Sequence, residues 1–396
     1  MSVGTPFHPR AAALNRKMQW REWSGYWASS AYADSHDIEY NAIREAVAVI
    51  DVSPLYKYRV TGPDALRLVD RVITRDATKL KVGQVYYTPW CDEQGKVVND
   101  GTVQRVGEHE VRWTAADPQY RWLTLNAARL DVAIEDVSES LAALALQGPF
   151  SRAVLEDATG EDFTDLRYFR RRASSIAGVP IDVSRTGYTG DLGYELWIPA
   201  ESAEAVWDQL FEVGRAYAIR PAGMLALDVT RLEAGLILLE VEYTSARHAM
   251  NPEQNYSPFE IGLGSLVAFD KADYVGRRAL VAEQAAGGPA RRLVGLQFDW
   301  YGIERLFDAR GLPPAVSPVV DRSAVPVFAD NRQVGKATSR GWSPILKQAI
   351  ALASVPPGYE RIGTQLEVEW TVEGRRGRVG GTVVGLPFLD LVRRRM

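Results

Sequence analysis

The chain has 396 residues, more than a single hydrophobic core usually supports, so two or three domains are expected. Hydrophobic residues make up 46% and charged residues 24%, a balance that is typical of folded proteins and excludes a largely disordered chain. The 46 basic and 50 acidic side chains give a net charge of −4, and the arginine clusters at residues 170–172 and 393–395 are short and separate. A nucleic acid is therefore not an expected partner.

The common signals of secretion, membrane insertion and metal binding are missing from the sequence. The single cysteine, Cys91, excludes a disulfide framework and fits a reducing compartment, so we expect a cytoplasmic protein. No apolar run is long enough to span a bilayer, and the first residues lack the apolar core of a signal peptide. The four histidines, His8, His36, His109 and His248, are far apart and lack metal-ligand spacing, so no metal is expected, although a site made of carboxylates alone stays open.

Residues 1–132 alternate between helical and strand patterns. Residues 1–45 are rich in aromatic side chains and are interpreted as an arm or lid, which ends in a helix that runs into a strand, NAIREAVAVIDVS. The segment YKYRVTG alternates as a strand, PDALRLVDRVI predicts a helix opened by Pro63, and VVNDGTVQRV with HEVRWTA predicts a hairpin. This mixture indicates an α+β fold.

A second unit of the same kind begins near residue 141. LAALALQGPFSRAVLE predicts a strand and a helix, DVSRTGYTGDLGYELWIP predicts two alternating strands around a loop, and ESAEAVWDQLFEVGRAY predicts another helix. The small and polar residues of AEQAAGGPARR indicate a linker, after which short strands dominate and helical signal is confined to residues 343–353. We therefore expect two intertwined α+β domains in residues 1–285 and a β-rich domain in residues 286–396.

Several segments, taken in order, carry a resemblance to a known family. They are DVSPLYKYRVTGPDAL, GQVYYTPWCDEQGKVVND, LALQGP, SRTGYTGDLGYEL, RPAGMLALDVTRLEAG, SPFEIGLGSLV with YVGRRAL, and KATSRGWSPILKQAIALA. In this order the chain resembles the aminomethyltransferase family, the folate-binding T-protein of glycine cleavage and its demethylase relatives. The resemblance implies a three-domain, cloverleaf-like α+β fold with folate in a central channel and a β-barrel-like C-terminal domain. It also implies a one-carbon transferase that uses tetrahydrofolate.

The resemblance assigns the anchor of the folate pteridine to Glu195, whose carboxylate would accept from the ring 2-amino group and N3–H. In the strand GYELWI, Glu195 and Trp197 point to one face and Tyr194, Leu196 and Ile198 to the other. A carboxylate beside a tryptophan suits a flat aromatic ligand. The alternative is that Glu195 is an exposed residue of an amphipathic strand.

Three further residues are assigned to folate by the same resemblance. Tyr188 lies in a turn flanked by glycines, Tyr87 belongs to the G-x-x-x-Y stretch, and Arg231 belongs to D-V-x-R-L-E. Two of them have structural alternatives, because Tyr188 can pack on its own hairpin and Arg231 can pair with Asp228 at i, i+3.

Asp100 is the expected catalytic carboxylate. It ends VVND, where the family usually carries two aspartates of which the second faces the folate nitrogens, and this chain keeps the second while Asn99 replaces the first. The folate nitrogen would attack the activated carbon directly, and Asp100 would orient it, balance its developing charge or relay its proton. The alternative is a turn residue, because a D-G dipeptide is also a hairpin signal.

Three departures from the glycine-cleavage pattern bear on the donor. Residues 95–100 are G-K-V-V-N-D in place of G-G-x-x-D-D, residues 225–228 are L-A-L-D in place of G-A-R-D, and residues 239–262 carry extra residues. With the aromatic N-terminus, these features resemble the O-demethylase branch that acts on methoxylated aromatics. Tyr243 and Tyr32 are candidates to protonate the departing phenolate, and Arg121 is a candidate partner for a substrate carboxylate. Their structural alternatives are an interface residue, lid packing and a surface charge, respectively.

Three other functions remain open. A glycine-cleavage aminomethyltransferase would act on a lipoylated carrier protein, a methylene transferase would open a methylenedioxyphenyl donor, and a folate-binding protein would keep the scaffold without transfer. The altered residues 95–100 and 225–243 argue against the first, and the retention of Asp100 argues against the last.

Overall fold

The computed structural model describes residues 2–395, which form two compact units. Unit 1 comprises Met1–Thr88, Asn99–Leu227 and Leu391–Met396, and unit 2 comprises Pro89–Val98 and Asp228–Asp390. The chain passes from one unit to the other within the hairpin that contains residues 85–107 and again within a helix, α7 (Met224–Glu233). The division expected at residues 285 and 286 stays a prediction.

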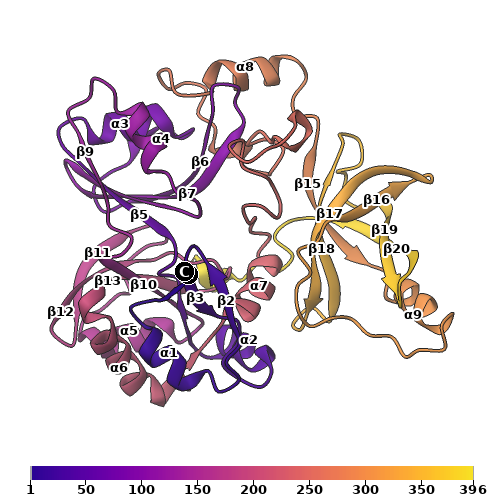
Figure 1. Cartoon of the computed structure of the whole chain (residues 1–396), viewed down its shortest axis with the longest axis horizontal. Helices are drawn as coiled ribbons and strands as arrows, with labels where there is room; N and C mark the ends of the chain where they lie inside the picture. Colours follow the sequence, from indigo (N-terminus) through magenta and orange to yellow (C-terminus); the bar gives the residue numbers. More distant parts are fainter. Residues whose placement is uncertain (1, 396) are drawn as a thin grey trace. The chain divides into compact units, whose positions relative to one another are not determined.

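The larger sheet of unit 1 has six strands in the order β11, β12, β13, β10, β4, β14 (Figure 1). Their bounds are β4 Ala48–Asp51, β10 Leu141–Gln147, β11 Arg171–Ile176, β12 Val179–Ser184, β13 Gly193–Pro199 and β14 Arg220–Pro221. Strand β13 pairs antiparallel with β10 and β12, so Glu195 stands opposite Ala145 on one side and Ser184 on the other. The strands predicted near residues 141, 182 and 193 are confirmed, and the second of them begins three residues earlier than the predicted segment.

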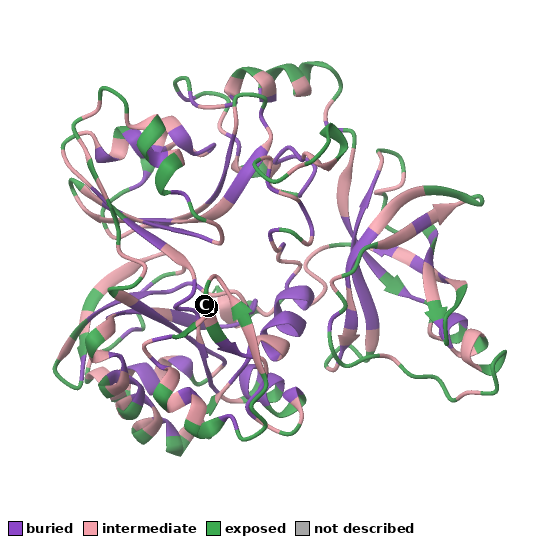
Figure 2. Ribbon diagram, viewed as in Figure 1, coloured by how far each residue is buried: buried purple, intermediate pink, exposed green. Residues whose placement is uncertain are grey.

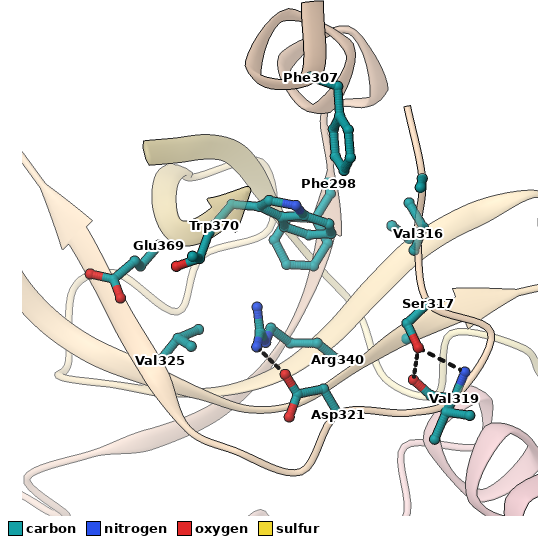
Figure 3. Close-up of a pocket in the computed structure, with 14 residues that line it drawn as sticks. Phe298, Phe307, Val316, Ser317, Val319, Asp321, Val325, Arg340, Glu369 and Trp370 are labelled. Carbon is teal, nitrogen blue, oxygen red and sulfur yellow. Dashed lines mark hydrogen bonds and ion pairs between the residues drawn. The ribbon is translucent and has the colours of Figure 1, made fainter. Parts of the chain in front are cut away.

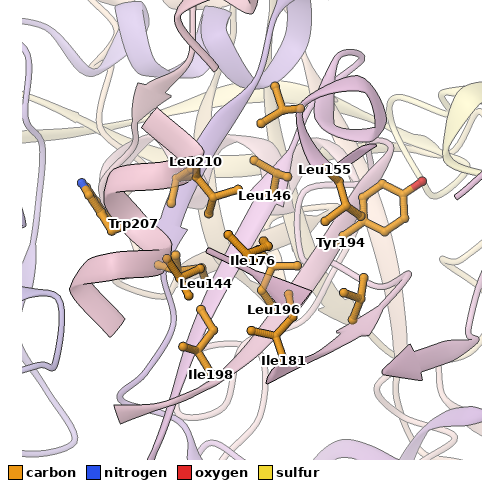
Figure 4. Packing of buried hydrophobic residues seen from close by; sticks show 14 of the residues in the cluster. Leu144, Leu146, Leu155, Ile176, Ile181, Tyr194, Leu196, Ile198, Trp207 and Leu210 are labelled. Atoms are coloured by element: carbon orange, nitrogen blue, oxygen red, sulfur yellow. The ribbon is translucent and has the colours of Figure 1, made fainter. Parts of the chain in front are cut away.

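The apolar face of this sheet packs against helices α5 (Ser151–Thr159) and α6 (Ala203–Gly214), and α1 (His8–Leu14) contacts α6. Figure 4 shows the resulting core, and Figure 2 shows the exposed outer faces of the helices. As the two-residue period of a strand predicts, Tyr194, Leu196 and Ile198 are buried in this core. Each such side chain contributes about 1.5–3 kcal/mol on burial, which keeps Glu195 and Trp197 on the opposite face.

The second sheet of unit 1 has the order β6, β7, β8, β5, β9. Helices α3 (Ala65–Val72) and α4 (Tyr120–Asn126) pack against each other beside it (Figure 1). The strand bounds are β5 Tyr56–Thr61, β6 Val85–Cys91, β7 Val97–Gly107, β8 Glu110–Ala115 and β9 Ala133–Asp136. The predicted hairpin of β7 and β8 is confirmed. Because β7 runs unbroken through Asp100, the alternative that this residue lies in a turn is wrong.

The aromatic N-terminus forms a small sheet in the order β1, β3, β2 and the helix α2. The bounds are β1 Val3–Gly4, β2 Trp20–Trp23, β3 Tyr26–Ser29 and α2 His36–Glu45. Phe7 belongs to the core of the large sheet, and Arg10 forms 2.6 Å ion pairs with Glu204 and Asp208 of α6. The start of this segment is anchored in the body of unit 1, and its interpretation as an arm or lid stays a prediction.

Unit 2 contains a closed barrel with the strand order β15, β18, β17, β16, β19, β20, which confirms the expected barrel-like C-terminal domain. The bounds are β15 Arg292–Phe298, β16 Val325–Ala329, β17 Arg332–Ser343, β18 Gln348–Val355, β19 Gln365–Val372 and β20 Arg375–Val384. The barrel interior is filled by small and β-branched side chains such as Ala351, Val368 and Val379. Outside the barrel lie α8 (Arg277–Ala285) and α9 (Trp300–Asp308).

The helical signal near residues 343–353 is wrong, because this segment is the turn before β18 and most of β18 itself. The strand is buried along nearly its whole length, and a short continuous apolar run does not distinguish a buried strand from a helix. The helix of this region is α9, which begins where the side chain of Asp299 accepts a 3.1 Å hydrogen bond from the N–H of Tyr301. Helix α8 takes in the start of the expected linker, since alanine and glutamine favour helix.

Short 3₁₀ turns complete the regular structure, at Ala77–Lys79, Ala200–Ser202, Arg215–Tyr217, Pro252–Gln254, Gly264–Leu266 and Val392–Arg394. Within residues 2–395, the helices are too short or too polar to cross a membrane.

Candidate active site

Strands β6 and β7 bring Tyr87 and Asp100 together in unit 1. The phenol of Tyr87 donates a 2.7 Å hydrogen bond to Oδ2 of Asp100, and both side chains are half-buried. Burial, the Asp100 carboxylate and the nearby Tyr188 phenol raise the pKa of Tyr87 well above its ordinary value. Tyr87 therefore keeps its proton and holds the carboxylate by a charge-assisted hydrogen bond.

Asn99 supports Asp100 from the buried side of β7. Its side chain is fully buried, and its Oδ1 accepts a 2.8 Å hydrogen bond from the N–H of Asp100. Its Nδ2 has no hydrogen-bond partner among residues 2–395. An aspartate at this position would place a second carboxylate beside Asp100, which raises the pKa of one of the two. Asn99 thus supplies the backbone acceptor without adding charge.

The loop between β12 and β13 carries Tyr188 and is shaped by a buried glutamine, Gln147, at the end of β10. Gln147 donates from Nε2 to the carbonyl of Thr186 at 3.3 Å and accepts at Oε1 from the hydroxyl of Thr189 at 2.7 Å. A Cβ on Gly187 would lie 2.2 Å from Oε1 of Gln147, so a larger residue at this position would have to displace the Gln147 side chain from its bonds to the loop. The loop is therefore positioned by the sheet rather than by its own hairpin alone.

Glu195 has a half-buried carboxylate, so it is not a freely exposed strand residue. The hydroxyl of Thr186 donates a short hydrogen bond to its Oε2. Burial raises the pKa of Glu195, and the bond from Thr186 opposes that effect. Within the described part of the chain, this hydroxyl is the one hydrogen-bond donor to the carboxylate, so Oε1 and a lone pair of Oε2 remain to accept from a ligand.

Arg231 lies in unit 2, fully buried in a polar network. Its guanidinium donates to Oδ1 of Asp228 at 2.9 Å, to Oε2 of Glu242 at 3.0 Å and to Oγ of Ser339 at 2.7 Å. The ion pair with Asp228, expected as the structural alternative, is present. Its assignment to folate stays a prediction.

The three candidates for the donor side have different surroundings. In unit 1, Tyr32 is buried, and burial together with Asp51 and Glu39 raises its pKa far above the ordinary value. In unit 2, Tyr243 is buried in the predicted insertion, where its carbonyl accepts a 2.8 Å hydrogen bond from the N–H of Glu240.

Arg121 is exposed on α4 in unit 1. Among residues 2–395, no hydrogen bond or ion pair connects it to Tyr87, Asp100, Tyr188 or Glu195. The structure therefore brings Tyr87, Asp100 and Tyr188 together, whereas Arg121 is not joined to them.

A separate cavity of about 300 Å³ lies at the barrel in unit 2. Figure 3 shows the guanidinium of Arg340 below the rings of Phe298 and Trp370, with Asp321 as its ion-pair partner. Glu369, which also lines the cavity, pairs with Arg376 at 3.8 Å. Because these charges are already matched, nothing in the wall selects a ligand of one charge, and we place the candidate site at Asp100 instead.

Two contributors to the site were missed in the sequence. Thr186 lies two residues before Tyr188 in the same loop, so its position was a usable signal. Gln147 has no such signal, because its contacts with Thr186 and Thr189 join segments about 40 residues apart.

Comparison with known proteins decides the family. The model of the GCVT N-terminal domain matches residues 7–271, and that of the glycine cleavage T-protein C-terminal barrel domain matches residues 310–390. The chain belongs to the aminomethyltransferase family. The first match covers the whole candidate site, and the second covers most of the barrel. Members of this family are tetrahydrofolate-dependent one-carbon transferases, so the expected enzyme class and cofactor are confirmed at the level of the family.

The similar proteins carry the names of two different activities. An aminomethyltransferase of Moorella thermoacetica is 35% identical over 97% of both chains, and one of Caldanaerobacter subterraneus is 35% identical over 86% of both. A trimethylamine-oxide aldolase of Ruegeria pomeroyi is 34% identical over 98% of this chain, but this chain spans only 47% of that protein.

A solved structure supports the family's fold. The glycine cleavage system aminomethyltransferase T of Bartonella henselae superimposes with a TM-score of 0.82 at 23% identity, covering 98% of this chain and 99% of that one. The α+β class with a C-terminal barrel is therefore confirmed.

Proposed function

We propose that this aminomethyltransferase-family protein moves a one-carbon unit from a small donor, a methoxylated aromatic, to tetrahydrofolate, with Asp100 at the reacting centre. The observation that carries the proposal is the hydrogen bond of 2.7 Å by which Tyr87 orients the Asp100 carboxylate. A carboxylate held in this way, partly out of water, stabilises developing positive charge better than one in bulk solvent.

The residues of unit 1 suit the pteridine of the folate. Its 2-amino group and N3–H are a pair of donors, and the Glu195 carboxylate retains acceptor sites beside the bond from Thr186. Tyr188, near Tyr87, adds an aromatic surface next to Asp100. Bound tetrahydrofolate would supply the nucleophilic nitrogen that takes up the one-carbon unit.

The transfer balances as a displacement at carbon. A C–N bond forms from the nitrogen lone pair while the methyl C–O bond breaks, and its electron pair goes to the aryl oxygen. Asp100 receives the N–H proton that the new bond makes acidic, and the phenolate takes up a proton from water to leave as a phenol. The proton that Asp100 later returns to water closes the balance. Asp100 and Tyr87 therefore act on the nitrogen side of the reaction.

On the donor side, Tyr32 and Tyr243 remain the proposed candidates to assist the departure of the aryl oxygen. The raised pKa of Tyr32 makes it a weaker acid than an ordinary tyrosine, so we assign it a hydrogen bond to that oxygen rather than complete proton transfer. Arg121 remains the proposed partner for a carboxylate on the aromatic ring. The cytoplasmic location expected from the sequence also stays a proposal.

A second candidate donor is a methylated amine or its N-oxide. It is favoured by the relative from Ruegeria pomeroyi, which is named for trimethylamine oxide and aligns with 98% of this chain. A lipoylated carrier protein is a third candidate donor, because the resemblance to the glycine-cleavage T-protein implies one and curated relatives are named aminomethyltransferases. Because the donors are supplied one at a time, the donor that supports turnover separates them, and the folate product shows whether a methyl or a methylene unit is transferred.

The test is to incubate the protein anaerobically with tetrahydrofolate and one donor at a time, and to identify the folate product by mass spectrometry. The donors are methoxybenzoates, a methylenedioxybenzoate, trimethylamine N-oxide and an aminomethylated lipoyl carrier. Methyl-tetrahydrofolate from a methoxybenzoate, abolished by Asp100→Asn, is the expected result. Turnover that survives Asp100→Asn would refute the catalytic assignment, and tetrahydrofolate binding without turnover of any donor would refute transfer in favour of a binding protein.

A further inference from the structure

A chain of buried hydrogen bonds leads from Trp197 to Glu195 along one face of the large sheet. The indole Nε1 of Trp197 donates to Oγ of Ser184 at 3.1 Å, and Oγ of Ser184 lies 2.9 Å from Oγ1 of Thr186. The Thr186 hydroxyl donates the short bond to Oε2 of Glu195. The linking side chains are buried, with Ser184 at 0%, Trp197 at 2% and Thr186 at 5% exposed.

When Glu195 is ionised, the hydrogen bonds between Trp197 and Glu195 can be donated in only one order. The indole N–H can only donate, and an ionised carboxylate can only accept. Since the single proton of Thr186 is used on Glu195, the 2.9 Å contact between the two hydroxyls must carry the proton of Ser184. The other acceptor near Ser184, the carbonyl of Glu195, is more distant at 3.4 Å.

We infer that Trp197, Ser184 and Thr186 form a hydroxyl relay that keeps Glu195 ionised and aimed as an acceptor for its ligand. The three are positioning residues, because they act through Glu195. The identity of that ligand, a pteridine with its pair of donors, rests on the proposed function. The relay itself does not depend on it.

The register of the sheet explains why the relay is rigid. Ser184 stands directly opposite Glu195 between β12 and β13, and Asp182 stands opposite Trp197. The guanidinium of Arg112 lies over the indole, 5.2 Å from the ring centroid, and pairs with Asp182 at 2.8 Å. The indole is thus held in place on the face opposite the hydrophobic core, and the relay begins from a fixed donor.

The relay lowers the cost of a buried charge. Burial raises the pKa of Glu195, and the hydrogen bond from Thr186 lowers it, so removing the bond should favour the neutral acid. A neutral acid has a proton on one oxygen and accepts poorly from two N–H donors. The relay therefore sets the pH above which Glu195 can recognise its ligand.

The phenol and the guanidinium groups near Glu195 keep one charge state across the acid range. The phenol of Tyr168 interacts electrostatically with the Glu195 carboxylate, but burial raises the pKa of this phenol, so it stays neutral in the acid range. Arg112 and Arg171, which both pair with Asp182, have pKa values lowered by burial to about 10 and stay charged. The carboxylate that pairs with both arginines, Asp182, is separated from Glu195 by following the carboxyl signal of Glu195 itself.

The experiment measures the pKa of Glu195 in the ligand-free protein from the carbon-13 signal of its carboxyl group, assigned by its loss in Glu195→Gln. In Thr186→Val, which keeps the shape and removes the hydroxyl, we expect the acid dissociation constant of Glu195 to fall about ten-fold or more. Thr186→Ser, which restores a hydroxyl, should return it to the wild-type value. Ser184→Ala should change it in the same direction as Thr186→Val, but less, because Thr186 keeps its proton for Glu195.

Two outcomes would overturn the relay: an unchanged pKa of Glu195 in Thr186→Val, or a change in Thr186→Ser as large as that in Thr186→Val. Should Thr186→Val fail to fold, the comparison of wild type with Ser184→Ala and Thr186→Ser decides in the same way. Titration of wild type with tetrahydrofolate is a separate arm. A wild type that does not bind tetrahydrofolate refutes the proposed function, whereas the carboxyl titration still decides the relay.

Discussion

The Tyr87 phenol donates to Oδ2 of Asp100, while the Asp100 backbone N–H is bonded to the side chain of Asn99. The catalytic candidate is thus held at two points, one on its side chain and one on its backbone. Tyr87 comes from β6, whereas Asp100 and Asn99 belong to β7. This arrangement sets the carboxylate in one direction before any ligand arrives, which is the condition for electrostatic preorganisation.

If Tyr87 acts by orienting Asp100, its effect on catalysis depends on that carboxylate. Tyr87→Phe should lower kcat/KM for one-carbon transfer by about 10- to 100-fold, the usual range for a hydrogen bond to a charged group. In the Asp100→Asn background the same change should cost much less. Steady-state kinetics of the four proteins form the double-mutant cycle. Equal losses in both backgrounds would show that Tyr87 acts independently of Asp100.

Glu195 predicts a pH dependence of tetrahydrofolate affinity. Burial raises its pKa, and the ionised form is the one that accepts from the pteridine, so affinity should increase as the pH rises through this raised pKa and then level off. Glu195→Gln should bind about 10- to 100-fold more weakly above that pKa and show a flat profile. Fluorescence titration at a series of pH values measures both effects. Glu201→Gln, at an exposed site just after the same strand, is the matched control and should behave as wild type.

The buried Lys57 predicts that stability rises with pH in the alkaline range. Its Nζ donates to the carbonyls of Ser53 at 2.6 Å and Leu55 at 2.8 Å, and burial lowers its pKa from 10.5 to about 8. Between these values the unfolded chain binds more protons at this site than the folded one, so the free energy of unfolding rises with pH. Below about pH 8 both states are protonated and the destabilising effect is complete.

The measurement for Lys57 is urea unfolding between pH 7 and 10.5. Over the full interval the contribution amounts to about 3 kcal/mol, and it should disappear in Lys57→Met. Lys81→Met, at an exposed position, should keep the wild-type dependence. A wild type and a Lys57→Met variant with parallel pH profiles would contradict the prediction.

Substitutions of Arg231 should separate its contribution to the stability of the fold from its expected role in folate binding. Arg231→Met leaves Glu242 without its buried cation and Asp228 with only its ion pair to Arg322, and should reduce the free energy of unfolding by about 3–5 kcal/mol. Arg231→Lys keeps the charge but loses the fork of donors, and its unfolding free energy should fall by less. Urea unfolding measures the stability of both variants, and folate titration of Arg231→Lys tests the role expected from the family. Wild-type stability in Arg231→Met would show that the network does not support the fold.

The sequence by itself determined the class of the fold, the family and the local direction of key side chains. Alternation in GYELWI placed Glu195 opposite a core face that the structure confirms, because the two-residue period of a strand is a local property. The prediction of a helix near residues 343–353 was wrong, because a continuous apolar run fits a buried strand as well as a helix. Only the closure of the barrel decides between them.

Only the tertiary structure decided which groups act on the candidate site. The bonds from Tyr87 to Asp100 and from Trp197 through Ser184 to Thr186 depend on strand pairing, which joins residues that sequence distance does not relate. The burial that raises the pKa values of Tyr32, Tyr87 and Glu195 is likewise a property of the packed chain. The local sequence pattern therefore identifies the candidate carboxylates. The surrounding sheet determines their charge state, their orientation and their capacity to accept hydrogen bonds from a ligand.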